Sequence, residues 1–91
     1  MFDLTGGRCA YCDCVLEPEG NGARSFIVEH VVHTSSGGPD NLANYVPACA
    51  ACNTAKSAEH VLTFIRKRFS LARAAPQSVA LAVVPKLEAA E

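Results

Sequence analysis

A chain of 91 residues is long enough for one domain with a small hydrophobic core. Its formal net charge of −1 excludes a protein that binds nucleic acid through a basic surface over its whole extent, so any such contact has to be local. The first residues lack the long apolar core of a secretory signal peptide, and no apolar run approaches the roughly 20 residues that span a bilayer. We therefore expect a soluble, cytoplasmic protein that makes no contact with membranes.

The strongest feature is a pair of C-x-x-C motifs that lie far apart in the chain. Five cysteines are present, and in a reducing compartment clustered cysteines more often bind metal than form disulfides. A two-residue spacer lets two thiolates of one tight turn bind one ion, and two such turns complete a tetrahedral zinc site with zinc–sulfur distances of about 2.3 Å. The predicted zinc ligands are Cys9, Cys12, Cys49 and Cys52.

Such a tetrathiolate site has no open coordination position, so it stabilises the fold and takes no part in catalysis. It would contribute on the order of 10 kcal/mol to folding, which suits a chain with so small a core. Cys14 is expected to be a spare thiol, although it could replace Cys12 as a ligand. The alternatives are a redox-active C-x-x-C motif and disulfides, which need an oxidising compartment and leave one of the five cysteines unpaired.

The first predicted strand follows a turn region rich in Pro and Gly at residues 17–25. Residues 26–32, FIVEHVV, are apolar and β-branched and predict a strand that carries a Glu-His pair in its middle. Residues 34–41, TSSGGPDN, predict a loop. Residues 45–56, YVPACAACNTAK, predict a second short strand that runs into a helix.

A longer helix is predicted over residues 57–75. Ser57 is expected to cap its N-terminus, and Pro76 is expected to stop it. Its apolar side chains fall on one helical stripe at Val61, Ile65, Phe69 and Ala72. We assign residues 1–75 to one domain, and residues 76–91 to a Val/Ala-rich tail that is a short strand, a partner contact or disordered.

The residues from the first cysteine pair onward follow a known pattern. Glu29-His30 is followed by Gly37-Gly38 and then by Asn44, and the second cysteine pair continues as Cys49-x-x-Cys52-Asn53 with Lys56 after it. With these elements the chain resembles the HNH endonucleases, specifically the small cysteine-bearing members found in bacteria and phages. The resemblance covers Cys9 to Lys56, which is more than half of the chain, and its separate elements agree in order and spacing.

The resemblance implies an α+β fold, the ββα-metal (His-Me) finger. Two short antiparallel strands and a helix surround one divalent ion, and here a four-cysteine zinc site would staple them and a C-terminal helix would follow. By position, His30 matches the general base that deprotonates water, and Glu29 matches the acidic ligand of the ion, which is normally Asp. Asn44 matches the Asn that braces the loop between the strands, and Asn53 matches the second ligand of the ion.

Hydrolysis of a phosphodiester needs these residue types. Water is a poor nucleophile at neutral pH, and histidine is the side chain that accepts a proton there. A hard divalent ion such as Mg²⁺ neutralises the charge that grows on the phosphate, and it prefers oxygen ligands such as those of Glu29 and Asn53. Glutamate is one methylene longer than aspartate, so its carboxylate lies roughly 1.5 Å further out, and a misplacement of about 1 Å can cost on the order of 100-fold in rate.

Structural roles compete with these assignments. A His-Glu pair on a strand is more often a surface ion pair, and Asn53 could cap or brace its helix. His33 stands where relatives commonly carry Pro, and it is either a phosphate contact or accessory ligand, or a residue that only ends the strand. Gly37 and Gly38 are expected to serve the backbone geometry of the loop.

A basic cluster on the longer predicted helix supplies a local site for nucleic acid. The expected phosphate contacts are Arg66, Lys67 and Arg68, with Arg73 further along and Lys56 after the second cysteine pair. Contacts of this kind give an affinity that is independent of sequence and sensitive to salt. Alternatively this helix face is only solvated, and Lys56 only favours the C-terminus of its own helix.

We therefore expect a metal-dependent HNH endonuclease that hydrolyses DNA, with a structural Zn²⁺ and a catalytic Mg²⁺ or other divalent ion. The alternative is a non-catalytic zinc module of the same fold that binds nucleic acid or a protein partner. Both candidates keep the zinc-binding cysteines. They differ in the role of Glu29, His30 and Asn53, which are catalytic only in the nuclease. Specificity is expected to come from a homodimer, from a phage or bacterial protein partner, or from the structure of the DNA.

Overall fold

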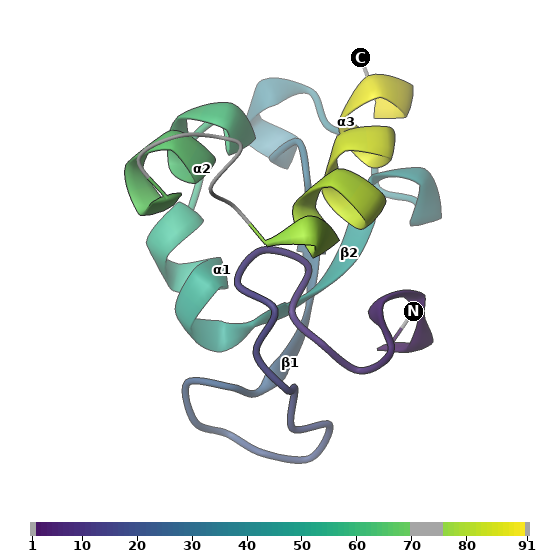
Figure 1. Cartoon of the computed structure of the whole chain (residues 1–91). Coiled ribbons are helices and arrows are strands. Elements are labelled where there is room, and N and C mark those ends of the chain that lie inside the picture. Colours follow the sequence, from purple (N-terminus) through teal and green to yellow (C-terminus); the bar gives the residue numbers. More distant parts are fainter. Residues whose placement is uncertain (1, 70–75, 91) are drawn as a thin grey trace.

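The computed structural model describes residues 2–69 and 76–90 of the chain. Strands β1 (Phe26–His30) and β2 (Tyr45–Cys49) pair antiparallel, and helix α1 (Ala50–Lys56) follows β2 without a break and contacts both strands (Figure 1). The predicted ββα arrangement in a small α+β fold is therefore confirmed.

The end of β1 is set by one buried side chain from the loop before β2. His30, the last residue of β1, faces Tyr45, the first residue of β2. The predicted strand extends to Val32, but at that residue the side chain of Asn44 takes the place of a strand partner. Its Oδ1 accepts a hydrogen bond from the Val32 N–H at 2.9 Å, and its Nδ2 donates to the Val32 carbonyl at 2.9 Å. The strand pairing therefore stops where a side chain satisfies the backbone.

The loop between the strands contains two short 3₁₀ turns, η2 (Thr34–Ser36) and η3 (Leu42–Asn44). Gly37 ends η2 with φ of +86°, a backbone conformation that favours glycine. A Cβ added to Gly38 would lie 1.8 Å from the carbonyl oxygen of Val32. The expectation that both glycines serve the backbone geometry of this loop is therefore confirmed. A further 3₁₀ turn, η1 (Phe2–Thr5), begins the described chain.

The prediction that Ser57 caps a helix that begins there is wrong. Ser57 instead closes α1, with φ of +48°, and its N–H donates to the Asn53 carbonyl at 3.0 Å. Helix α2 spans Val61–Phe69, and the Nδ1 of His60 accepts a hydrogen bond from the Leu62 N–H at 3.1 Å at its start. An imidazole therefore takes the capping role that the sequence assigned to a serine.

Helix α2 covers the core with one face. It buries Val61, Phe64 and Ile65 and exposes its basic residues, in agreement with the predicted amphipathic stripe at its beginning. The predicted continuation of this helix to residue 75, with Ala72 and Arg73, lies outside the described residues.

The tail is helical and packs on the core. A π-helical turn (Val79–Val83) leads directly into α3 (Val84–Ala90) (Figure 1). Lys86 donates from Nζ to the carbonyl of Leu42 at 2.7 Å, and α3 lies against η3. The strand option for the tail is therefore wrong over these residues, while disorder, a partner contact and the domain boundary after residue 75 stay predictions. The tail residues that are buried are Val79, Ala82, Val83 and Leu87.

One hydrophobic cluster joins the first C-x-x-C motif, strand β2 and the three helices. Strand β1 packs against it through the partly buried Phe26, and Tyr11, Val46 and Val83 are among its completely buried members. Across residues 2–69 and 76–90, no helix combines the length and the apolar character that a membrane crossing needs.

Candidate active site and metal centre

The two C-x-x-C turns bring four thiols together. The Sγ atoms of Cys9, Cys12, Cys49 and Cys52 all lie within 4.8 Å of one another. A tetrahedral ion with zinc–sulfur bonds of about 2.3 Å separates its sulfurs by about 3.8 Å, and the Sγ atoms of Cys12 and Cys49 are already 3.8 Å apart. These thiols therefore fit a zinc ion in number, type and spacing. Cys14 lies outside the group of four, and burial raises the pKa of its thiol to about 12.

Backbone N–H groups point at the sulfurs of this cluster. The Sγ of Cys9 accepts three of them at 3.4, 3.5 and 3.3 Å, from Tyr11, Cys12 and Cys49. The Sγ of Cys49 accepts the N–H of Cys52 at 3.4 Å. The hydrogen bond from the Cys52 thiol, together with these backbone donors, lowers the pKa of Cys9 from 9.0 to about 4. These contacts favour thiolate, the form that binds metal, at Cys9. The hydrogen bond to Cys9 raises the pKa of Cys52, and burial raises the pKa of Cys49.

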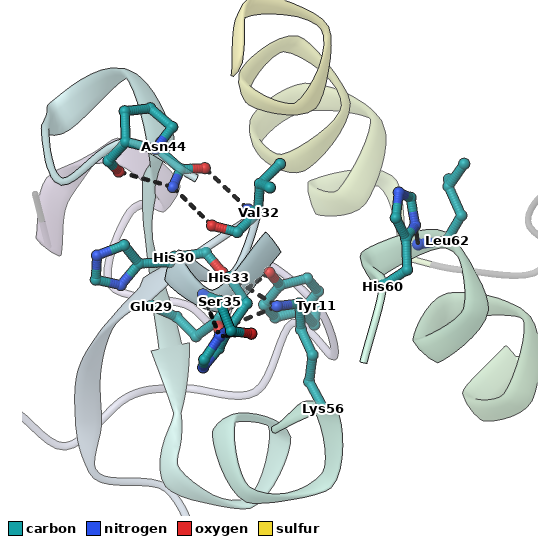
Figure 2. Close-up of polar contacts among 11 residues, drawn as sticks. Tyr11, Glu29, His30, Val32, His33, Ser35, Asn44, Lys56, His60 and Leu62 are labelled. Atoms are coloured by element: carbon teal, nitrogen blue, oxygen red, sulfur yellow. Dashed lines mark hydrogen bonds and ion pairs between the residues drawn. The ribbon is translucent and has the colours of Figure 1, made fainter. Parts of the chain in front are cut away.

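Glu29 points into the protein, where two buried side chains hold its carboxylate. The Tyr11 hydroxyl donates to Oε2 at 2.6 Å, and the Lys56 ammonium donates to Oε1 at 3.2 Å. Lys56 also donates to the His30 carbonyl at 3.1 Å, so it binds the strand at two adjacent residues (Figure 2). The exposed fraction of the side chain is 4 % for Glu29 and 0 % for Lys56. We call Tyr11, Glu29 and Lys56 the carboxylate clamp.

The clamp corrects the expectation that Lys56 contacts phosphate. A completely buried ammonium does not reach a nucleic acid at the surface, and its charge is balanced inside the protein by Glu29. Burial raises the pKa of Tyr11, and the negative charge of Glu29 raises it further. Tyr11 therefore stays protonated and remains a hydrogen-bond donor to the carboxylate.

His30 extends away from the carboxylate clamp, because neighbouring residues of a strand point to opposite faces (Figure 2). Its Nε2 lies 3.0 Å from Oδ1 of Asp40, and the Tyr45 hydroxyl donates to the same carboxylate oxygen. The Tyr45 ring also packs edge-on against the imidazole, with ring centroids 4.8 Å apart. The bonds from Tyr45 and then from His30 lower the pKa of Asp40, so this exposed carboxylate is charged at neutral pH.

Asn44 holds the two segments that meet at His30. Besides its two bonds to Val32, its Nδ2 donates to the carbonyl of Pro39 at 2.9 Å, and the side chain is completely buried (Figure 2). It thereby ties the residues after His30 to the residue before Asp40. This arrangement agrees with a bracing role and leaves Asn44 without access to substrate.

Three of the four predicted catalytic residues line one open cavity of about 370 Å³. Glu29 and His30 line it from β1, and Asn53 lines it from α1. His33, which precedes η2, lines it as well. The other wall residues are Val28, Thr54 and Ser57. Residues that are far apart in the sequence thus meet in one concave site, and we call this candidate active site the catalytic cavity.

The oxygen atoms of Glu29 and Asn53 are of the type that binds a hard divalent ion. The side-chain amide of Asn53 makes no hydrogen bond within the part of the chain that the structure describes, so its oxygen is available. A carboxylate has about four acceptor positions, so Glu29 retains some after binding Tyr11 and Lys56. However, Lys56 already balances the charge of Glu29, which makes the site weaker for a cation than a free carboxylate would be.

The basic cluster of α2 lies next to a second open cavity, of about 460 Å³. Arg66, Lys67 and Arg68 are exposed, and Lys67 also donates to Glu59 at 2.7 Å. Lys67 and Arg68 line this second cavity. Ser57 lines both cavities, so the two cavities adjoin at the end of α1.

Sequence reasoning missed Tyr11 and Asp40. Tyr11 stands in the spacer of a metal motif, where no rule asks for a particular residue, although a large aromatic side chain there indicates packing. Asp40 belongs to a loop of turn-forming residues, in which a carboxylate is more often a turn residue than a partner of a histidine. Only the folded hairpin brings Asp40 to His30.

Comparison with known protein families supports the resemblance to the HNH endonucleases. Residues 9–59, more than half of the chain, match the family model of the HNH endonucleases. No curated protein and no solved structure matches the chain. The matched range holds both C-x-x-C motifs, the two strands and the residues of the catalytic cavity. By this match, and with its ββα fold and its cluster of four cysteines, the chain belongs to the HNH endonuclease family.

Proposed function

We propose that this protein is a metal-dependent endonuclease that hydrolyses phosphodiester bonds of DNA in the catalytic cavity. The observation that supports this proposal most is the meeting of Glu29, His30 and Asn53 in that one cavity. A nuclease needs a proton acceptor beside oxygen ligands for a divalent ion, and these three side chains supply both.

His30 acts as the general base in this proposal, with Asp40 as its positioning residue. An ionised carboxylate only accepts hydrogen bonds, so the Nε2 of His30, 3.0 Å from Asp40, carries the hydrogen. The neutral ring then presents an unprotonated Nδ1, which takes the proton of the attacking water. Tyr45 holds the carboxylate of Asp40, and the bracing bonds of Asn44 hold the loop that carries it.

Glu29 and Asn53 are the residues that would hold the catalytic ion, through oxygen atoms that suit Mg²⁺ or another hard cation. When bound, the ion supplies positive charge that stabilises the phosphate and the leaving oxygen in the transition state. The carboxylate clamp keeps Glu29 in place before substrate arrives. Because Lys56 competes for the same carboxylate, we expect ion binding that is weak and that tightens when a phosphate adds further oxygen ligands.

The exposed Arg66, Lys67 and Arg68 bind the phosphate backbone of DNA beside the cavity in this proposal. Since the net charge of the chain is −1, this affinity is expected to be modest and steeply dependent on salt. A second copy of the chain or a protein partner would then supply specificity.

A non-catalytic zinc module that binds nucleic acid or a protein is the second candidate. It is favoured by one observation, the buried ion pair of Glu29 with Lys56, which already satisfies the carboxylate without an ion. Such a module would keep the zinc, the fold and the basic cluster but would not cut.

A plasmid cleavage assay separates the two candidates. Zinc-loaded protein is incubated with supercoiled DNA across Mg²⁺, Mn²⁺ and Ni²⁺, with His30→Ala as the matched control. The nuclease proposal expects cleavage by the wild type with at least one ion and none by the control. If the wild type never cuts, or if His30→Ala cuts equally fast, the proposal is overturned.

A further inference from the structure

His33 is a second histidine of the catalytic cavity, and its ring is held by its own turn. It precedes η2 and caps it, since its Nδ1 accepts the Ser35 N–H at 3.1 Å (Figure 2). The Ser35 hydroxyl lies 2.8 Å from the same nitrogen. The side chain is half-buried and lines the cavity together with Glu29, His30 and Asn53.

The capping bond decides which nitrogen of His33 carries the hydrogen. A backbone N–H can only donate, so Nδ1 must be an unprotonated acceptor. The neutral imidazole therefore has its hydrogen on Nε2, which stays open, and the Ser35 hydroxyl also donates to Nδ1. His30 carries its hydrogen on Nε2 as well, but there the Asp40 carboxylate accepts it and Nδ1 stays open. One ring of the cavity thus offers a lone pair, and the other offers an N–H.

This tautomer argues against His33 as a ligand of an ion. A metal needs an unprotonated imidazole nitrogen. The lone pair of Nδ1 is already used by the backbone of Ser35, and Nε2 carries hydrogen. What His33 can offer to a ligand is a hydrogen-bond donor.

Besides His33, the uncharged side-chain donors of the cavity are Asn53, Thr54 and Ser57. Among the described residues that line it there is no Lys or Arg, and the ammonium of Lys56 is engaged behind the wall by Glu29 and the His30 carbonyl. Resting on the proposed function, we propose that His33 contacts the substrate, its Nε2–H donating to a non-bridging oxygen of the phosphodiester. His33 then binds the phosphate that His30 helps to hydrolyse.

Two substitutions separate this contact from the capping role. Asparagine is a good capping residue whose short side chain can accept the Ser35 N–H, but it has no donor at the distance of Nε2. Glutamine is a poorer cap whose longer side chain brings an amide N–H to about the place of Nε2. His33→Asn should therefore keep the thermal unfolding midpoint of the wild type and bind DNA about tenfold more weakly, whereas His33→Gln should lower the midpoint and keep most of the binding.

Binding is measured with a short DNA duplex and zinc-loaded protein without added divalent ion, and single-turnover cleavage is measured with Mn²⁺. His33→Asn should cut roughly 10- to 100-fold more slowly, because a hydrogen bond to a charged phosphate is lost. The chemical shifts of the His33 ring nitrogens should show the hydrogen on Nε2 in the free wild type.

Three results would overturn the inference. They are a hydrogen on Nδ1 of His33, unchanged DNA binding by His33→Asn, and a loss of Mn²⁺ affinity in that variant without a loss of DNA affinity. The binding measurement does not need cleavage. If the wild type never cuts, weaker binding by His33→Asn still supports the phosphate contact, while the nuclease proposal fails.

Discussion

Removing the cation of the carboxylate clamp tests the interior of this protein most directly. Lys56→Met keeps most of the side-chain volume but leaves the buried carboxylate of Glu29 with only the Tyr11 hydroxyl as partner. At 3.2 Å, two unit charges attract each other by about 5 kcal/mol at an effective dielectric constant of about 20. Side chains that are 0 % and 4 % exposed leave no room for solvent screening to reduce this value.

We therefore expect Lys56→Met to lower the free energy of unfolding by about 3–5 kcal/mol, the usual cost of breaking a buried ion pair from one side. For a domain of this size that corresponds to a fall of roughly 12–40 °C in Tm. The matched control is the double variant Lys56→Met with Glu29→Gln. It removes both charges, so it should recover most of the lost stability.

Urea unfolding of the zinc-loaded proteins at one fixed zinc concentration measures both variants, because bound metal itself changes apparent stability. The two single variants and the double variant form a double-mutant cycle that isolates the coupling between the charges. The reasoning is refuted if Lys56→Met costs less than about 1 kcal/mol, or if the double variant is no more stable than Lys56→Met alone.

Three further outcomes are expected for the catalytic groups and the zinc, and a fourth for the basic cluster. His30→Ala should slow single-turnover cleavage by roughly 100- to 10,000-fold with zinc content and DNA affinity near wild type, and equal cleavage would exclude it as the base. Asp40→Asn should slow cleavage by about tenfold. An asparagine amide can donate as well as accept a hydrogen bond, so it does not fix the hydrogen of the His30 ring on Nε2. An unchanged rate would exclude a positioning role for Asp40. Strong chelation should remove one zinc per chain and unfold it, as followed by elemental analysis and circular dichroism, and a folded metal-free chain would contradict this. Charge reversal of Arg66, Lys67 and Arg68 should weaken DNA binding equally for all sequences and flatten its salt dependence. An unchanged affinity in a salt titration would show that this helix face is only solvated.

The sequence predicts the framework well because metal motifs carry their geometry in their spacing. A C-x-x-C pair readily forms a tight turn around an ion, and two pairs predict one cluster, as found for Cys9, Cys12, Cys49 and Cys52. The strand–helix junction after residue 45 is equally local, because a short apolar strand runs straight into a helical pattern.

The partners of individual polar side chains could not be predicted in the same way. Lys56 resembles an exposed helix-end lysine, yet it is buried because Glu29, 27 residues earlier in the chain, lies opposite it in the fold. Ser57 is a residue type that often caps helices, but the backbone turns there with positive φ and the next helix begins later. Both errors arise because tertiary contacts override local preference.

The carboxylate clamp also joins the two halves of the molecule. Tyr11 lies in the spacer of one cysteine pair, and Lys56 ends the helix that begins beside the other. Both halves of the four-cysteine cluster are therefore connected through Glu29 to the strand of His30. Cobalt in place of zinc would therefore act as an optical reporter. Its thiolate absorption depends on the geometry of the four sulfurs, and a ligand that pulls on Glu29 would act through Tyr11 on the spacer between Cys9 and Cys12. A change in this absorption on adding Mn²⁺ or DNA would report binding in the catalytic cavity, although the cobalt lies outside that cavity.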